Sequence, residues 1–317
     1  MLIHFEEGYM RELFVNRETV YDMMYNSIVM AATLMPSDVK NTLLEYLEKE
    51  QYETARLHLE TIVKNCESAE KEGRLLCPDT GSPLFYVRAG DNVRIEGGFS
   101  TLYEVSKEAI KKATAKARLR PNMVHPITRE NPGTNVGYYL PKVEIRFDPQ
   151  IDFLDIIAIP KGGGSEIFGT FYRMMYPADG KKGIMKFILD CIKESTYAGK
   201  TCPPNVIGIG IGGTADICTK IAKEAAVLRP IGNRHPDKEI SSLEEELVQM
   251  VKDSGIGPMG MGGGSGILDV HIEYAVTHTA GLPVAFNAQC SLSRRKVARF
   301  TLDNQITYSD FPEWNYR

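Results

Sequence analysis

Three cysteines of this chain lie in loops that also carry prolines, an aspartate or arginines. They occur in Leu76-Cys77-Pro78-Asp79-Thr80-Gly81, in Thr201-Cys202-Pro203-Pro204 and in Gln289-Cys290-Ser291-Leu292-Ser293-Arg294-Arg295. Backbone N–H groups in such loops are free to bond sulfur and lower the pKa of a thiol, which favours the metal-binding thiolate. Three loop thiolates suit an iron–sulfur cluster whose fourth iron is open to substrate, or a zinc ion with one open position. The Asp79 carboxylate would then work beside the metal.

The spacing of these cysteines does not by itself identify a metal site, because they are far apart and no CxxC pair occurs. The other three cysteines, Cys66, Cys191 and Cys218, each fall on the apolar face of an expected helix. Free cysteine packs as a small hydrophobic side chain, so we expect these three in the core.

Two glycine-rich segments each follow an expected strand. Gly208-Ile-Gly-Ile-Gly-Gly213 fits the GxGxxG pattern of dinucleotide-binding proteins, which makes a nucleotide-dependent oxidoreductase an alternative function. No acidic residue follows about 20 residues later to bind a ribose, so close strand–helix packing is the favoured interpretation. In Lys161-Gly-Gly-Gly-Ser-Glu166 the backbone N–H groups could approach an anion, or the glycines could form a plain turn.

Periodicity predicts the elements that must position these loops. Apolar spacing predicts helices over 17–34 and 38–51 and a third helix that follows and ends near 71. Further helices are expected over 101–117, 183–197, 214–228 and 242–254, the last with a Ser242/Glu245 capping box. Strands are expected at 83–88, 94–96, 143–147, 153–159, 206–211, 267–273 and 283–288. We expect a mixed α/β fold: one compact unit with a helical N-terminal layer (1–75) packed on an α/β cluster-binding catalytic region (76–317).

Composition narrows the class of protein. The 317 residues are 43% apolar and 25% charged, as in an ordinary globular protein, and the net charge of -4 does not favour nucleic acid or a membrane as partner. The start of the chain has no basic segment followed by an apolar one, so a cytoplasmic protein is expected. Six cysteines in such a chain are then free, metal-bound or catalytic rather than disulfide-bonded.

Five motifs occur here in the order found in one known family. The chain resembles, from about residue 15 to 302, the α subunit of two-subunit class I fumarate hydratases and L(+)-tartrate dehydratases. In single-chain class I fumarases the same region is the N-terminal catalytic domain. The motifs are Cys77-Pro-Asp-Thr-Gly81, Asn131-Pro-Gly-Thr-Asn135, Lys161-Gly-Gly-Gly-Ser165, Cys202-Pro-Pro204 with Ile211-Gly-Gly-Thr214, and His278-Thr-Ala-Gly-Leu-Pro283 ahead of Cys290.

The resemblance implies an iron–sulfur hydro-lyase that reversibly dehydrates a small 2-hydroxy dicarboxylic acid, of the malate/fumarate or tartrate type. An oxygen-sensitive [4Fe–4S] cluster would bind to Cys77, Cys202 and Cys290, with its open iron acting as a Lewis acid. Asp79 matches an aspartate that is paired with a histidine, and His278 matches that histidine. Matches to substrate-binding positions are Arg120, Asn131, Lys161 and Gly164.

Two departures from the family pattern bear on substrate and assembly. The family usually has a substrate-contacting glutamine where this chain has Pro78, so the resemblance does not fix which diacid is used. The family's proton-abstracting residue lies in a C-terminal domain of another fold, which implies a separate β subunit for this chain and a higher oligomer. A non-catalytic metal-binding subunit is the other alternative.

Overall fold

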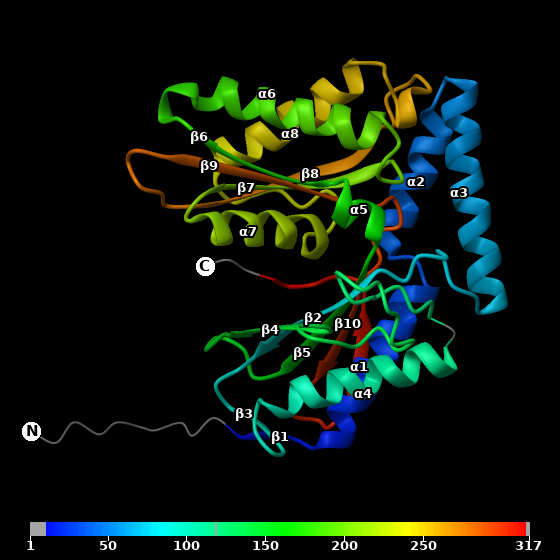
Figure 1. Ribbon diagram of the computed structural model, residues 1–317, viewed down its shortest axis with the longest axis vertical. Coiled ribbons are helices and arrows are strands. Elements are labelled where there is room, and N and C mark those ends of the chain that lie inside the picture. Colours follow the sequence, from blue (N-terminus) through cyan, green and yellow to red (C-terminus); the bar gives the residue numbers. More distant parts are fainter. Residues whose placement is uncertain (1–10, 118, 315–317) are drawn as a thin grey trace, which may run out of the picture.

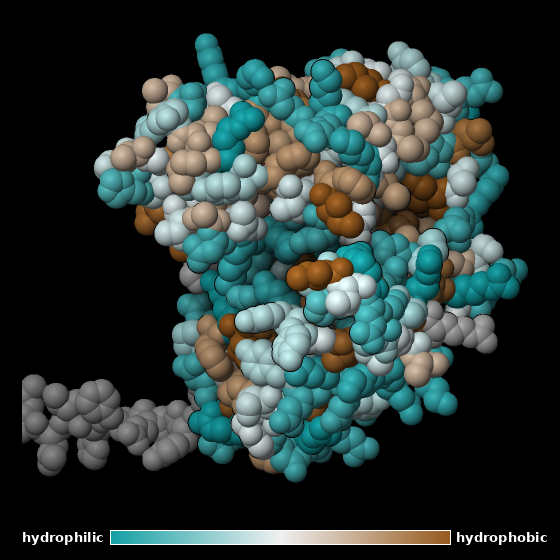
Figure 2. Space-filling model, viewed as in Figure 1, coloured by the Kyte–Doolittle hydropathy of each residue, from teal (hydrophilic) through white to brown (hydrophobic). Residues whose placement is uncertain are grey.

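The chain folds into two lobes, each built on its own β-sheet (Figure 1). The computed structural model describes residues 11–117 and 119–314. One lobe, lower in Figure 1, holds a five-stranded sheet of order β11-β10-β5-β2-β4, and the other a four-stranded sheet of order β6-β9-β7-β8. Figure 2 shows that this face of the molecule is hollowed between the lobes and lined there mainly by hydrophilic side chains. The combination confirms the expected mixed α/β class.

The five-stranded lobe is covered on one face by α1 (Arg17–Thr33) and α4 (Thr101–Lys116). Its strands are β2 (Ser82–Ala89), β4 (Lys142–Phe147), β5 (Leu154–Lys161), β10 (Lys296–Phe300) and β11 (Ile306–Ser309). β2 is parallel to β4, whereas β5, β10 and β11 run antiparallel to their neighbours. A parallel pair, β1 (Leu13–Val15) and β3 (Val93–Ile95), lies beside this lobe. Apolar side chains of α1 at helical spacing are buried against β5 and β10 and contribute to the core of this lobe.

The four-stranded lobe has helices on both faces of its sheet. Its strands are β6 (Thr170–Met175), β7 (Asn205–Gly212), β8 (Ile267–Ala275) and β9 (Leu282–Gln289). β7 is parallel to β8 and antiparallel to β9. α6 (Gly180–Ile192), which continues as the π-helical segment Lys193–Tyr197, and α8 (Lys238–Asp253) pack on the face that carries Ile207 and Ile209.

The opposite face of β7 carries Gly208 and Gly210, on which α7 (Ala215–Leu228) packs. A Cβ atom at Gly208 would lie 2.1 Å from the Ala222 carbonyl oxygen, and one at Gly210 2.1 Å from that of Cys218. A side chain at either position would therefore collide with the backbone of the helix. The interpretation of the GxGxxG segment as close strand–helix packing is confirmed.

α2 (Ser37–Lys49) and α3 (Glu53–Glu72) pack together beside the four-stranded lobe and bury apolar side chains against Val206 and Leu268. In the first turn of α2, the Asp38 carboxylate accepts hydrogen bonds from Ile231 N at 2.9 Å and from Arg295 Nη2 at 2.5 Å. Ile231 belongs to the loop after α7, whereas Arg295 directly precedes β10, so one carboxylate ties the two lobes together. The division of the chain near residue 75 stays a prediction.

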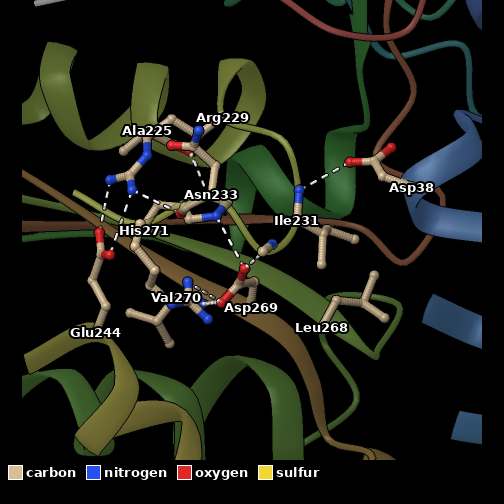
Figure 3. A network of polar contacts seen from close by, with 12 residues as sticks. Asp38, Ala225, Arg229, Ile231, Asn233, Glu244, Leu268, Asp269, Val270 and His271 are labelled. Carbon is tan, nitrogen blue, oxygen red and sulfur yellow. Dashed lines mark hydrogen bonds and ion pairs between the residues drawn. The ribbon is translucent and has the colours of Figure 1, made fainter. Parts of the chain in front are cut away.

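Within the described residues, the outer edge of β8 pairs with no further strand and is covered by side chains, some of which Figure 3 shows. Glu244 of α8 accepts a hydrogen bond from Ile272 N at 2.8 Å, and Arg229 donates to the Ile272 carbonyl at 3.1 Å and to Glu244 at 2.7 Å. Glu273 is the second carboxylate on Arg229, at 3.2 Å. Because unpaired edge groups invite strand pairing with another chain, this buried network seals the edge of the sheet.

Most expected elements are present, with three kinds of difference. α8 begins at Lys238 and is capped by Asp237, so the Ser242/Glu245 capping box is wrong; the polar first turn of the helix hid its start. The glycine run after Lys161 is neither a turn nor an open loop but the start of a short helix, α5 (Gly163–Ile167). The short strands β1, β6, β10 and β11 were not expected, because three to six residues carry little periodicity.

In residues 11–117 and 119–314, no helix combines the length and the apolar character needed to cross a membrane.

The Arg229 network predicts a pH dependence of stability. Burial raises the pKa of Glu273 from 4.5 to about 7. The folded state therefore keeps a proton that the unfolded chain releases, and the free energy of unfolding should fall as pH rises from 4.5 to 7. We expect Glu273→Gln to reduce this fall by about 3 kcal/mol in urea unfolding at a series of pH values. The exposed Glu239→Gln variant should keep the wild-type slope; equal slopes in all three proteins would contradict the assignment.

Candidate functional site

Two of the three loop cysteines meet because of the direction of their strands. Cys202 precedes β7 and Cys290 follows β9, and since these strands are antiparallel, both cysteines lie at the same end of the sheet. Ser291 N donates to the Cys202 carbonyl at 2.9 Å, which ties the two loops together. The Cys202 and Cys290 thiols are near enough to each other that their interaction lowers the pKa of Cys290 and raises that of Cys202.

The third cysteine, Cys77, reaches the same place from the other lobe. Its loop begins where Leu76 N donates to the Ala32 carbonyl at 2.9 Å and ends at β2. Arg294 crosses from the Cys290 loop and donates through Nη2 to the Asp79 carbonyl at 2.8 Å. A charge on Cys77 is close enough to contribute to the raised pKa of Cys202. The expectation that the three loops come together therefore agrees with the geometry.

Asp79 lies beside the same thiols. Ser82, at the start of β2, pairs with Lys161, at the end of β5, and this register places the glycine run against the Cys77 loop. The Asp79 carboxylate accepts a hydrogen bond from Gly163 N at 2.5 Å. A Cβ atom at Gly162 would lie 3.3 Å from the Cys290 sulfur and 3.6 Å from Asp79 Oδ2, so this thiol and this carboxylate flank one glycine.

Arg120 projects from a loop that is fixed to the Cys77 loop. Its backbone N donates to Thr80 Oγ1 at 2.7 Å, and its carbonyl accepts from the buried side chain of Asn135 at 2.9 Å. The Arg120 side chain itself is exposed. Asn131 is also exposed, but its amide is occupied within the loop, bonding the Pro121 carbonyl and Gly133 N at 2.8 Å each.

The glycine run and the preceding lysine occupy different environments. Gly164 is partly exposed, and a Cβ atom there would lie 3.3 Å from the Lys200 carbonyl oxygen. Lys161 is fully buried, with Nζ donating to Ser165 Oγ at 2.8 Å and to the Ala288 carbonyl at 2.6 Å. Burial lowers the pKa of Lys161 to about 8.

His278 is not brought to the cysteines within one copy of the chain. It lies in the connection between β8 and β9, where its Nδ1 accepts a hydrogen bond from Ala280 N at 3.1 Å. Cys290 follows the last residue of β9, so the length of that strand, about 25 Å for eight residues, separates the two. Figure 1 shows this orange connection at the opposite end of the four-stranded sheet from α5.

The remaining cysteines behave as expected. Cys66, Cys191 and Cys218 are buried in apolar clusters, and burial raises the pKa of each thiol to about 12. A cavity of about 1150 Å³ elsewhere in the molecule is lined by Arg229, His235, Glu273, Trp314 and their neighbours. None of the predicted site residues lines it.

The residues around the three thiols fit an iron–sulfur cluster. In the described part of the chain, no three His, Cys, Asp or Glu side chains are grouped closely enough to hold one metal ion. A cluster carries its own irons and sulfides between the protein thiolates, so its ligands stand further apart than those of a single ion. Two buried cations, Lys161 and Arg294, lie close to this site, and neither has an ion-paired carboxylate among the residues described. Their charges suit a negatively charged group, such as a cluster held by thiolates.

Sequence reasoning did not single out Arg294, Ser165 or Asn135. Arg294 and Ser165 lie within quoted motifs. The contact of Arg294 with the Cys77 loop depends on packing between segments remote in the sequence, and the contact of Ser165 with Lys161 depends on the short helix α5, which the glycine run did not predict. Asn135 closes the Asn131–Asn135 motif; its four hydrogen bonds and its φ of 57° give it a local role that the motif alone did not reveal.

The chain is similar to known proteins over most of its length. The family model described as fumarate hydratase (fumerase) matches residues 21–299. A Methanocaldococcus jannaschii protein provisionally named L(+)-tartrate dehydratase subunit alpha is 47% identical over 277 residues, which is 87% of this chain and 95% of that protein. The L(+)-tartrate dehydratase subunit alpha of Escherichia coli K12 is 33% identical over 281 residues, covering 89% of this chain and 90% of that protein. Together with the five ordered motifs, these matches show that the chain belongs to the fumarate hydratase family.

Proposed function

We propose that this chain is the α subunit of an iron–sulfur hydro-lyase that reversibly dehydrates a small 2-hydroxy dicarboxylic acid of the malate or tartrate type. Family membership and the names of the relatives support the reaction class. The observation that carries the proposal is the approach of three loop thiols, from two lobes, to one place beside Asp79.

Cys77, Cys202 and Cys290 would hold a [4Fe–4S] cluster. When bound, the cluster supplies an open iron that acts as a Lewis acid on the hydroxyl group to be eliminated. The chain supplies the surroundings: the bond from Gly163 N fixes the Asp79 carboxylate next to the Cys290 thiol, where it can hold a proton.

The residues that would bind substrate stand on the loops around the thiols. Arg120 offers a planar guanidinium for a substrate carboxylate, on a backbone that is held to Thr80. Gly164 offers a backbone contact, and Asn131 shapes the loop that carries Arg120 through its bond to the Pro121 carbonyl. Pro78 provides no side-chain donor, so substrate choice depends on other groups.

His278 can pair with Asp79 only if a second copy of the chain supplies it, because β9 separates the two within one copy. The surface beside His278 suits a protein contact. Val276 is 93% exposed, and the edge strand β6 presents Met174, 56% exposed, next to Gly281 of the same connection. Exposed apolar groups on an edge strand are typical of surfaces that another chain covers.

A β subunit would complete the site. In the family that the chain resembles, the proton-abstracting residue lies in a domain of another fold, and the relatives are named as alpha subunits. We therefore propose that the assembled enzyme contains at least two copies of this chain together with β subunits.

Replacing the proposed ligands should remove the cluster without unfolding the chain. After anaerobic reconstitution with iron and sulfide, Cys77→Ser, Cys202→Ser and Cys290→Ser should each retain well under half of the wild-type iron. Cys191→Ala, a core cysteine, should retain full iron while losing about 1 kcal/mol of stability. Iron analysis and visible absorbance give the readout, and equal iron in the three serine variants and wild type would refute the site.

A mixing experiment tests whether His278 acts on a second copy. Asp79→Asn and His278→Asn should each lower kcat by about 100-fold or more. When both variant chains are co-expressed with the β subunit, random pairing makes half of the pairs mixed, and each mixed pair has one intact site. The mixture should recover about a quarter of the wild-type activity. A mixture as inactive as its components would show that the two residues do not combine across copies.

A further inference from the structure

Lys161 is a buried lysine without an ion-paired carboxylate in the described part of the chain. It ends β5, has 0% exposure, and donates to one hydroxyl and one carbonyl, those of Ser165 and Ala288. A buried ammonium is strongly unfavourable unless a negative charge lies near it, because neutral acceptors replace only part of its hydration. The carboxylate of Glu166, on the same short helix as Ser165, is engaged by Lys223 at 2.5 Å instead.

Both hydrogen-bond partners of Lys161 adjoin Cys290. Ala288 precedes this cysteine by two residues on β9. The Ser165 hydroxyl, which donates to the Gly162 carbonyl at 3.0 Å, flanks Gly162 together with the Cys290 sulfur, at 3.7 Å and 3.3 Å from a Cβ atom placed there. The ammonium therefore lies one hydroxyl group away from the glycine that the Cys290 sulfur flanks. Among the charged groups that act on Lys161, the thiolate of Cys290 has the largest influence, ahead of the Glu166 carboxylate, and both raise its pKa against the lowering caused by burial.

A second buried cation acts on the same thiol. Arg294 is 6% exposed, and its hydrogen bonds to the residues that the structure describes go to the carbonyls of Asp79 and Thr80. It also acts on Cys290 through its charge. Two buried cations around one group of thiols balance the negative charge of thiolates held close together.

We propose that Lys161 is the buried counter-charge of the thiolate site and sets the electron affinity of the cluster held there, rather than binding substrate. This inference rests on the proposed function. The ammonium is enclosed by β5, α5 and β9, so a substrate carboxylate could reach it only by displacing Ser165 or the Ala288 carbonyl. A fixed positive charge beside a cluster favours the form that carries one more electron, and removing the charge has the opposite effect.

Lys161→Gln is the sharpest variant, because its amide keeps a donor for Ser165 or Ala288 while removing the charge. In the reconstituted holoenzyme, we expect about a tenfold fall in the equilibrium constant for one-electron reduction of the cluster. That fall is a shift of about 59 mV to more negative potential. The potential is measured by redox titration followed by electron paramagnetic resonance, with iron content measured on the same samples. Lys161→Met, which removes the donors too, should show the same shift and bind less iron.

The control is Lys186→Met, which makes the same change in net charge on the surface, where Lys186 pairs with Asp190. Its potential should equal that of the wild type. A Lys161→Gln protein that holds the cluster at the wild-type potential overturns the role of Lys161 and leaves the proposed function intact. A Lys161→Gln protein that binds no iron, although circular dichroism shows a native fold, would mean that the cluster cannot bind without the positive charge of Lys161. That result supports the proposal. A wild-type protein that binds no cluster overturns the proposed function and this inference with it.

Discussion

The antiparallel pairing of β7 with β9 decides where two of the three proposed cluster ligands meet. Because Cys202 precedes one strand and Cys290 follows the other, their backbones are joined at the same end of one sheet. The third thiol belongs to the other lobe, and it is placed there by the register of β2 against β5 and by Arg294, which links the two loops. The geometry of the site thus depends on how the two lobes meet.

Electrostatics explains why such a site needs its particular surroundings. Thiolates repel one another, and a partly buried position strengthens this repulsion because little water screens it. Lys161 and Arg294 offset it from within the protein, and the bond from Gly163 N holds the Asp79 carboxylate. Glycines at 162 and 163 leave room for the thiol and the carboxylate, since a Cβ atom at either would approach them to 3.3 Å.

The sequence predicts local features well and relations between distant segments poorly. Helical periodicity placed Cys66, Cys191 and Cys218 in the core, and the GxGxxG segment was interpreted as close packing on a helix. The family motifs identified the loops that converge. They did not reveal that β9 separates His278 from Cys290, because that separation depends on strand direction and length. Nor did they show that Lys161 is enclosed, since its burial results from packing between β5 and β9.

The most direct test of the account is diffraction at the iron absorption edge from anaerobically grown crystals of the chain with its partner subunit. The account predicts one anomalous peak per chain, bounded by the sulfur atoms of Cys77, Cys202 and Cys290 and adjacent to Asp79. Iron located elsewhere, or a peak that only one of these cysteines contacts, would contradict it.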